Sequence, residues 1–208
     1  MALDNYSNLK ETIVRLDGSS SVTDIVDDAI ILCESEMYAN AATTLNLRSL
    51  ENVTEYTSST STPYLALPTD YINLRRVRLK LPGKDQDILY ATPESMQSYS
   101  AAGRPKFFTV TDQIEFDRIA DSSYVVGLSY LAKVAALDDT NTANAVLTKF
   151  PTIYLYGAMW AVNLFNGEEQ KASYYYQLFI NSIKGANKLD KKGRYGPGAA
   201  MRTEGATP

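Results

Sequence analysis

The chain has 208 residues, and its 20 basic and 24 acidic residues give a formal net charge of −4. A protein that wraps DNA usually carries a basic surplus, so this composition argues against tight DNA binding but would let DNA slide through an assembly. Histidine is absent, which excludes the zinc sites and catalytic dyads that need this residue and removes the commonest general base.

The single cysteine and the lack of long apolar runs indicate the cellular compartment in which the protein folds. Cys33 alone cannot form a disulfide within the chain, so folding needs no oxidising compartment. The polar start MALDNYSNLKET lacks the apolar core of a secretory signal, and no stretch approaches the roughly 18 apolar residues of a membrane span. We therefore expect a soluble protein without a membrane span, made in a cytosol.

Helical spacing marks two helices in the first forty residues. The apolar positions of the first helix are Tyr6, Leu9, Ile13 and Leu16. This helix should end at Gly18, and Thr23 can cap the second, because a threonine side chain accepts a hydrogen bond from the first helical turn. The apolar positions of the second helix are Val22, Val26, Ala29, Cys33 and Met37.

From residue 47 to about residue 130 the apolar residues alternate with a period of two, which is typical of β-strands. In the clearest strand, residues 74–81, the basic side chains Arg76, Arg78 and Lys80 share one face, and apolar residues share the other. Further strands are expected at residues 87–90, 107–111, 114–116 and 124–130.

The sequence also predicts the conformation of two segments that connect these strands. Residues 57–63 are rich in Ser and Thr and should form an exposed polar tip between strands. Residues 92–99 should form a short helix, because Pro93 suits a first helical turn.

The last quarter of the chain predicts a short helix at residues 143–149, two longer helices and a tail. Pro151 suits the first turn of the first long helix, and Gly167 suits the left-handed residue that ends it. The second long helix carries an apolar stripe at Ala172, Tyr176, Phe179, Ile183 and Ala186. Six of the 16 residues from 193 to 208 are Gly or Pro, too many for a helix or a core strand, so this segment should be an extended tail.

The order of helices, strands and helices predicts an α+β fold. We expect the N- and C-terminal helices, in residues 1–46 and 134–192, to pack together as a helical bundle. Residues 47–133 would form an inserted β-rich domain, and residues 193–208 the extended C-terminal tail.

This order resembles that of the head-to-tail adaptor (connector) proteins of tailed bacteriophages. The resemblance covers roughly residues 5–192 and depends on these segments in sequence: YSNLKETI, LALPTDYINLRRVRL after a polar hairpin, a helix starting TPESM, GRPKFFTV, and YVVGLSYLAKVAALDDTNTANAVLTKFPTIYLYGAMWAVNLF. It implies a homo-oligomeric ring, usually of twelve copies, that sits under the portal protein and continues the DNA channel towards the tail. Expected partners are the portal and the tail tube, nozzle or tail-fibre proteins, with non-specific passage of double-stranded DNA.

The resemblance places the protein in the virion, at the head–tail interface, after synthesis in the bacterial cytoplasm. Its role would be structural, in genome retention and ejection, with no catalytic residue, cofactor or metal. Two candidate contact sets follow from the residues themselves. The first comprises Arg76, Arg78 and Lys80, which form either a solvated face, an inter-subunit contact with acidic patches, or a contact with DNA phosphates. The second comprises the tail anchors for the portal or an adjacent subunit: Arg194, Tyr195, Met201 and Arg202. The alternative is that the tail folds back on its own helix pair.

An alternative from another class is a cell-wall hydrolase acting during infection, and a third is a host-derived binding domain unrelated to virions. A glycosidase needs two carboxyl groups on opposite sides of the scissile bond, one of them with a raised pKa. The only adjacent aspartate pairs are Asp27 with Asp28 and Asp138 with Asp139, and both pairs lie where helix caps are expected. A buried carboxylate facing a cleft would favour the hydrolase.

Overall fold

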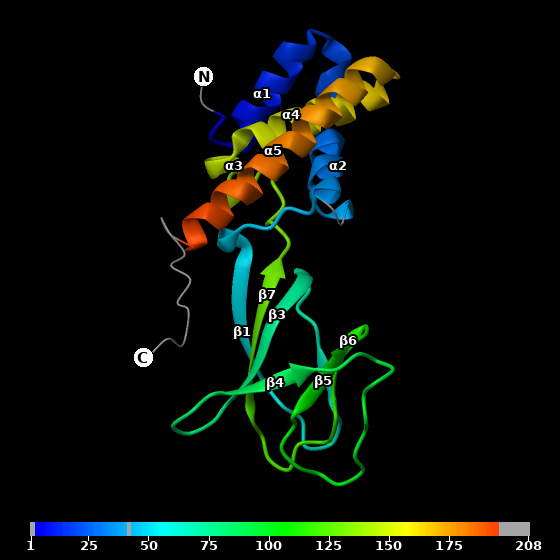
Figure 1. Ribbon diagram of the computed structural model, residues 1–208. Helices are drawn as coiled ribbons and strands as arrows, with labels where there is room; N and C mark the ends of the chain where they lie inside the picture. Colours follow the sequence, from blue (N-terminus) through cyan, green and yellow to red (C-terminus); the bar gives the residue numbers. More distant parts are fainter. Residues whose placement is uncertain (1–2, 41–42, 196–208) are drawn as a thin grey trace, which may run out of the picture. The chain divides into compact units, whose positions relative to one another are not determined.

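The computed structural model describes residues 3–40 and 43–195. The chain divides into two compact units, a helical unit of Met1–Ser49 with Val134–Pro208 and a β unit of Leu50–Lys133 (Figure 1). The mixed α and β content expected from the sequence is confirmed. That these segments fold as separate domains with the predicted boundaries stays a prediction.

In the helical unit, one apolar helix contacts all the others. The helices are α1 (Tyr6–Asp17), α2 (Val26–Ala39), α3 (Ala145–Lys149), α4 (Pro151–Phe165) and α5 (Glu169–Tyr195), with short 3-10 turns at Ser20–Asp24 and Arg48–Leu50. Helix α4 packs most extensively against α5 and α2, and also contacts α1 and α3 (Figure 1). Cys33 is fully buried beside α4, as the apolar stripe of α2 predicts.

The residues predicted to begin and end these helices largely do so. Gly18 and Gly167 adopt left-handed conformations, with φ of 79° and 73°, at the ends of α1 and α4. Pro151 lies in the first turn of α4, and Asn144 caps α3 by accepting hydrogen bonds from two backbone N–H groups. The expected cap at Thr23 is wrong, because Thr23 lies inside the 3-10 turn and α2 begins only at Val26.

Helix α5 continues past the boundary expected from the sequence. It ends at Tyr195, so residues 193–195 of the predicted tail are helical. Lysines in the last turns favour the negative end of the helix dipole, and one glycine there costs only about 1 kcal/mol, which explains the extension. Residues 196–208 lie outside the described residues.

The β unit is a curled seven-stranded sheet with strand order β1-β7-β3-β4-β5-β6-β2. The strands are β1 (Glu51–Thr57), β2 (Tyr64–Ala66), β3 (Tyr71–Lys80), β4 (Gln86–Tyr90), β5 (Phe107–Val110), β6 (Gln113–Phe116) and β7 (Val125–Ala132). All pairs are antiparallel except β4 with β5. Residues far apart in sequence therefore meet within the sheet, where β7 lies between β1 and β3.

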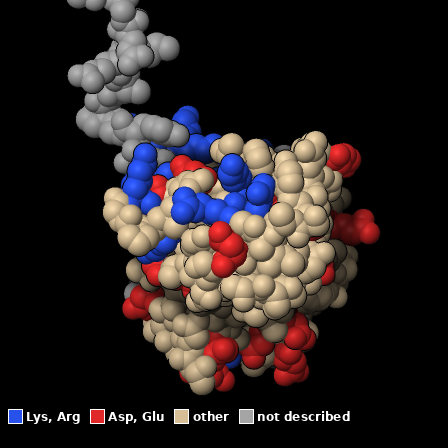
Figure 2. Space-filling model, turned by 90° about the horizontal axis from the view of Figure 1, so that it is seen from below, with Lys and Arg blue, Asp and Glu red and all other residues tan. Residues whose placement is uncertain are grey.

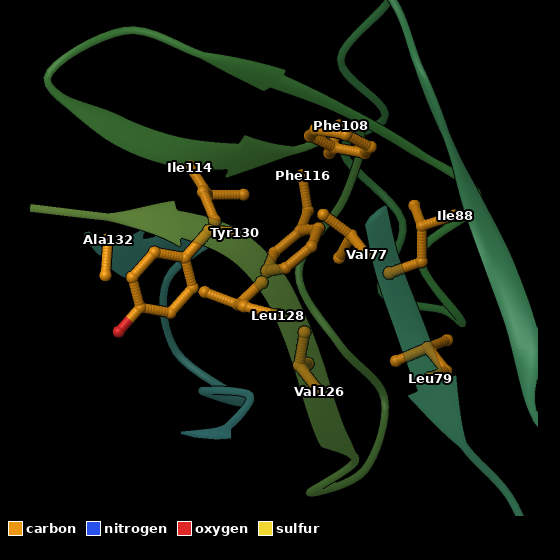
Figure 3. Packing of buried hydrophobic residues seen from close by; sticks show 10 residues of the cluster. All are labelled: Val77, Leu79, Ile88, Phe108, Ile114, Phe116, Val126, Leu128, Tyr130 and Ala132. Atoms are coloured by element: carbon orange, nitrogen blue, oxygen red, sulfur yellow. The ribbon is translucent and has the colours of Figure 1, made fainter. Parts of the chain in front are cut away.

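The core of this unit forms from one face of its strands. Val77 and Leu79 of β3 point inwards, between the outward basic side chains, and pack with side chains of β4 to β7 (Figure 3). This is the alternation that the sequence predicts. The remaining members of the cluster are Ile88, Phe108, Ile114, Phe116, Val126, Leu128, Tyr130 and Ala132.

The two connecting segments differ in how well the sequence predicted them. The helix expected at residues 92–99 is wrong, because the chain makes only a turn at Thr92–Ser95 and Tyr99 then bridges to Arg118. The tip between β1 and β2 is largely exposed, as expected, but Ser58 is buried, and its hydroxyl donates to Ser122 O and accepts from Tyr124 N. Within the described ranges, no helix is both long and apolar enough to cross a membrane.

Candidate interaction surfaces

The basic row on β3 exists, and its three cations have carboxylate partners inside the chain. Arg76 binds Asp87 of β4 through two hydrogen bonds, at 2.6 and 2.7 Å. Arg78 lies 3.3 Å from Asp85. Lys80 pairs with Glu55 of β1, and the cation therefore reaches across the intervening strand β7.

The Lys80–Glu55 pair crosses β7 at a glycine. Gly127 of β7 pairs with Glu55 on one side and with Arg78 on the other. A Cβ built on Gly127 would lie 3.8 Å from Lys80 Cε, so the lysine stem runs over the strand where no side chain stands. The sequence predicts that the basic side chains share one face of β3. It does not predict that Lys80 pairs with Glu55, which lies on another strand, 25 residues away.

The pairing changes the electrostatic character of the row. The hydrogen bond from Arg76 holds the pKa of Asp87 below its usual value, and Asp87 in turn raises the pKa of Arg76. In the space-filling view, lysine and arginine side chains gather with carboxylates among them, next to a broad area with few charges (Figure 2). Because each of its three cations pairs with a carboxylate, the row is a face of mixed charge. Pairs that are largely exposed contribute little to folding stability.

An aromatic hollow lies beside β4 and β5 in the same unit. Its volume is about 420 Å³, and Tyr90, Met96, Tyr99 and Phe107 contribute to its lining. Tyr90 is 58% exposed and Tyr99 46% exposed, and the guanidinium of Arg118 lies 4.3 Å from the centre of the Tyr99 ring. Such a hollow can accept an apolar side chain.

In each of the two aspartate pairs, one carboxylate accepts hydrogen bonds from nearby groups. Asp138 accepts hydrogen bonds from the backbone N–H groups of Thr140 and Asn141 and from the Thr140 hydroxyl, and these bonds lower its pKa. Burial tends to raise the pKa of Asp27, but hydrogen bonds from Tyr6 and Lys10 outweigh it and lower the pKa. A glycosidase acid needs the opposite shift.

Lys10 brings these two acidic segments together. Its Nζ lies 3.1 Å from Asp27 Oδ1 and 4.0 Å from Asp139 Oδ1. The lysine therefore ties α1 to the start of α2 and to the loop before α3. Within the described part of the chain, no group of three His, Cys, Asp or Glu residues could hold a metal ion.

A buried carboxylate that sequence reasoning missed lies at the centre of the helical unit. Glu34 of α2 is only 4% exposed, and its Oε1 accepts hydrogen bonds from Leu137 N at 2.9 Å and Tyr154 Oη at 2.8 Å. Asn144 Nδ2 donates to Tyr154 Oη and to Ala135 O. Burial, followed by the charge of Glu34, raises the pKa of Tyr154.

This network fixes the segment between β7 and α3 onto α2. Tyr38 adds a further contact, because its hydroxyl accepts a hydrogen bond from Val134 N. Backbone and tyrosine donors offset the cost of burying the Glu34 carboxylate, which gives this residue a structural role. The only sequence signal was its place on the buried side of α2, between Cys33 and Met37.

Only two of the four predicted tail anchors lie within the described residues. Arg194 and Tyr195 lie in the last turn of α5. Met201 and Arg202 lie outside the described residues. The joint role of the four residues therefore stays a prediction.

A protein-family model for the SU10 adaptor protein matches residues 4–202. Because the match covers nearly the whole chain, the protein belongs to the SU10 adaptor protein family. Membership indicates a structural adaptor of a phage that interacts with other virion proteins. No curated protein matches the chain.

Proposed function

We propose that this protein forms a ring, of twelve copies, that joins the portal to the tail of a tailed bacteriophage and continues the DNA channel for genome retention and ejection. The observation that carries the proposal is the family match over residues 4–202. The helical unit would serve as a rigid bundle, and the ring would bind the portal at one end and tail tube, nozzle or tail-fibre proteins at the other. The protein would be made in the host cytoplasm and end in the virion.

The mechanism of such a ring is geometric. Each copy presents two different surfaces, one to each neighbour, and the rotation between copies closes the ring. DNA would pass without sticking, because the net charge of −4 gives little non-specific attraction for phosphates. No observation favours the hydrolase. Asp27 and Asp138 have lowered pKa values, and the buried carboxylate of Glu34 accepts hydrogen bonds from Leu137 N and Tyr154 Oη inside the helical unit.

The proposal is tested by negative-stain imaging of the purified protein mixed with the portal of the same phage. We expect rings stacked coaxially on the portal, and class averages would give their copy number. A mixture in which the two proteins stay separate at micromolar concentrations would refute the proposal.

Our first specific prediction concerns the basic row as an inter-subunit contact. Changing Arg76, Arg78 and Lys80 to Glu should reduce the fraction of portals that carry a ring, because a neighbouring subunit would lose its cationic partners. The fold should survive, since the row is exposed and the core alternation on the opposite face is untouched. Ring occupancy is counted by imaging, and folding is checked by circular dichroism.

The structure supplies the control for this experiment. The triple change also places carboxylates against Asp85, Asp87 and Glu55, so a second variant reverses these three residues to Lys as well. This double reversal restores pairing inside the chain but not the original sign of the row. Rings that return with the double reversal would mean that the row acts only within its own subunit.

Our second specific prediction concerns the C-terminal tail, which we propose docks on the portal or an adjacent ring subunit through Arg194, Tyr195, Met201 and Arg202. Deleting residues 196–208 leaves α5 complete but removes Met201 and Arg202, so it should give a folded protein that joins the portal much more weakly. Fixing the backbone of a residue costs roughly 1–2 kcal/mol, and twelve simultaneous contacts can offset such a cost. Portal affinity is measured by sedimentation, with the pair Met201→Ala and Arg202→Ala as a milder variant. Unchanged affinity would contradict the prediction.

A further inference from the structure

The exposed side of the second half of α5 carries four lysines, which we call the lysine face: Lys184, Lys188, Lys191 and Lys192. Spacings of three, four, seven and eight residues place them on one side of the helix, and all four are exposed. Leu189, next to them, is 62% exposed. Within the described part of the chain, none of the four lysines has an ion-pair partner, and the nearby carboxylate of Asp190 is bound to Arg48.

The helix dipole accounts for Lys191 and Lys192, near the end of α5, but not for the rest of the lysine face. Cations favour the last turn of a helix, where they complement the helix dipole, but this effect fades beyond that turn. Lys184 lies about three turns before the end of α5 at Tyr195. Lysines four residues apart on a helix, such as Lys184 and Lys188, repel each other and destabilise the helix slightly. An anionic partner would offset this repulsion.

The same unit carries a matching surface, which we call the acidic face: Asp24, Asp27, Asp28 and Ile31, at the start of α2. All four residues are exposed, and Ile31 is 60% exposed. Asp27 is held by Lys10 and Tyr6, whereas Asp24 and Asp28 form no ion pair within residues 3–40 and 43–195. Each face thus combines like charges with one exposed aliphatic side chain, and the two faces have opposite sign.

The two faces cannot meet within one copy. The end of α5 is fixed to the segment that follows α2, through the hydrogen bonds of Asn187 with Asn46 and of Asp190 with Arg48 (Figure 1). The acidic face lies at the other end of α2, which has 14 residues and is therefore about 21 Å long. Because the surfaces differ and lie apart, a contact between them would join copies head to tail.

We propose that the lysine face of one copy binds the acidic face of a second copy, with Leu189, at the edge of the lysine face, packing against Ile31. The role of this contact in closing a ring rests on the function proposed above, whereas the contact itself does not. A DNA phosphate backbone could also bind the lysine face, but it would leave the exposed side chain of Leu189 and the separate acidic face without a partner.

A charge exchange between copies tests this pairing. The first variant carries Lys184→Glu, Lys188→Glu and Lys192→Glu. The second variant carries Asp24→Lys and Asp28→Lys. Asp27 is left unchanged because it binds Lys10 and Tyr6 within its own copy. By sedimentation without portal, each variant alone should self-associate about tenfold more weakly than the unmodified protein. An equal mixture should recover association, because each variant then offers the face that the other needs. Lys149→Glu, an exposed lysine on α3, is the matched control and should change nothing.

The outcomes separate this contact from the adaptor function. Recovery in the mixture, lost at high salt, supports the contact even if no ring forms on the portal. Variants that each still form normal rings on the portal would overturn the contact and leave the adaptor function standing. Loss of binding to double-stranded DNA in the lysine variant, with no recovery in the mixture, would assign the lysine face to DNA and overturn the proposal.

Discussion

Replacing Gly157 with alanine is expected to destabilise the helical unit by about 1–3 kcal/mol, the usual cost of overpacking a core. Gly157 lies in α4, where this helix passes between α2 and α5. A Cβ at this position would overlap Cys33 Sγ on α2 and lie 2.9 Å from Phe179 Cε2 on α5. Both neighbours are fully buried, so neither can move without disturbing its own packing. Urea unfolding followed by circular dichroism measures the free energy of unfolding.

The opposite effect is expected from the same substitution on α5. Gly185 is exposed, and within the described residues the position that its Cβ would take has open space around it. Alanine there should therefore stabilise the helix by about 0.5–1 kcal/mol. Adding Cys33→Ala to the Gly157→Ala variant should recover part of the loss, because it removes the sulfur that the new methyl group meets. A Gly157→Ala protein as stable as the Gly185→Ala protein would show that the three helices are not closely packed at this point.

Local rules predicted the parts of the fold that depend on local sequence. The left-handed glycines Gly18 and Gly167 and the first-turn Pro151 are governed by backbone sterics within a few residues, and the structure confirms them. The alternation of Val77 and Leu79 with basic residues needs only the period of a strand. Residues 92–99 show the limit, because a favourable first turn does not make a helix when no apolar stripe follows.

The pairings between distant segments could not be predicted in this way. The order of the strands places β1 beside β7, a contact between residues about seventy to eighty positions apart. The pair of Lys80 with Glu55 depends on that order, whereas Asp87 and Asp85, the partners of Arg76 and Arg78, lie just beyond the turn that follows β3. The alternating pattern predicts the basic face but not its neutralisation. Gly157 has no special signature in the sequence YLYGAMW, because its closeness to α2 and α5 is a property of three helices packed together.

Replacing Glu34 with alanine is expected to cost the helical unit about 3–5 kcal/mol. The change leaves the buried N–H of Leu137 without its acceptor and takes the acceptor from the hydroxyl of Tyr154. Each unsatisfied buried group costs about 1–3 kcal/mol, and the removed side chain also leaves a cavity. Urea unfolding measures the total, and hydrogen exchange at the Leu137 amide should show a loss of protection confined to this region.

Two variants isolate the role of the buried carboxylate. Glu36→Ala removes a glutamate from the same helix that is only half-buried and accepts a hydrogen bond from Tyr176, so it should cost about 1 kcal/mol. Tyr154→Phe removes the hydroxyl but keeps the bond from Leu137 to Glu34, so the Leu137 amide should stay protected. The segment from Val134 to Asn144 is fixed to α2 through Glu34 and Tyr38, and the loss of Glu34 should therefore loosen it before the helices separate. A Glu34→Ala protein no less stable than Glu36→Ala, with Leu137 still protected, would show that this segment is held by packing alone.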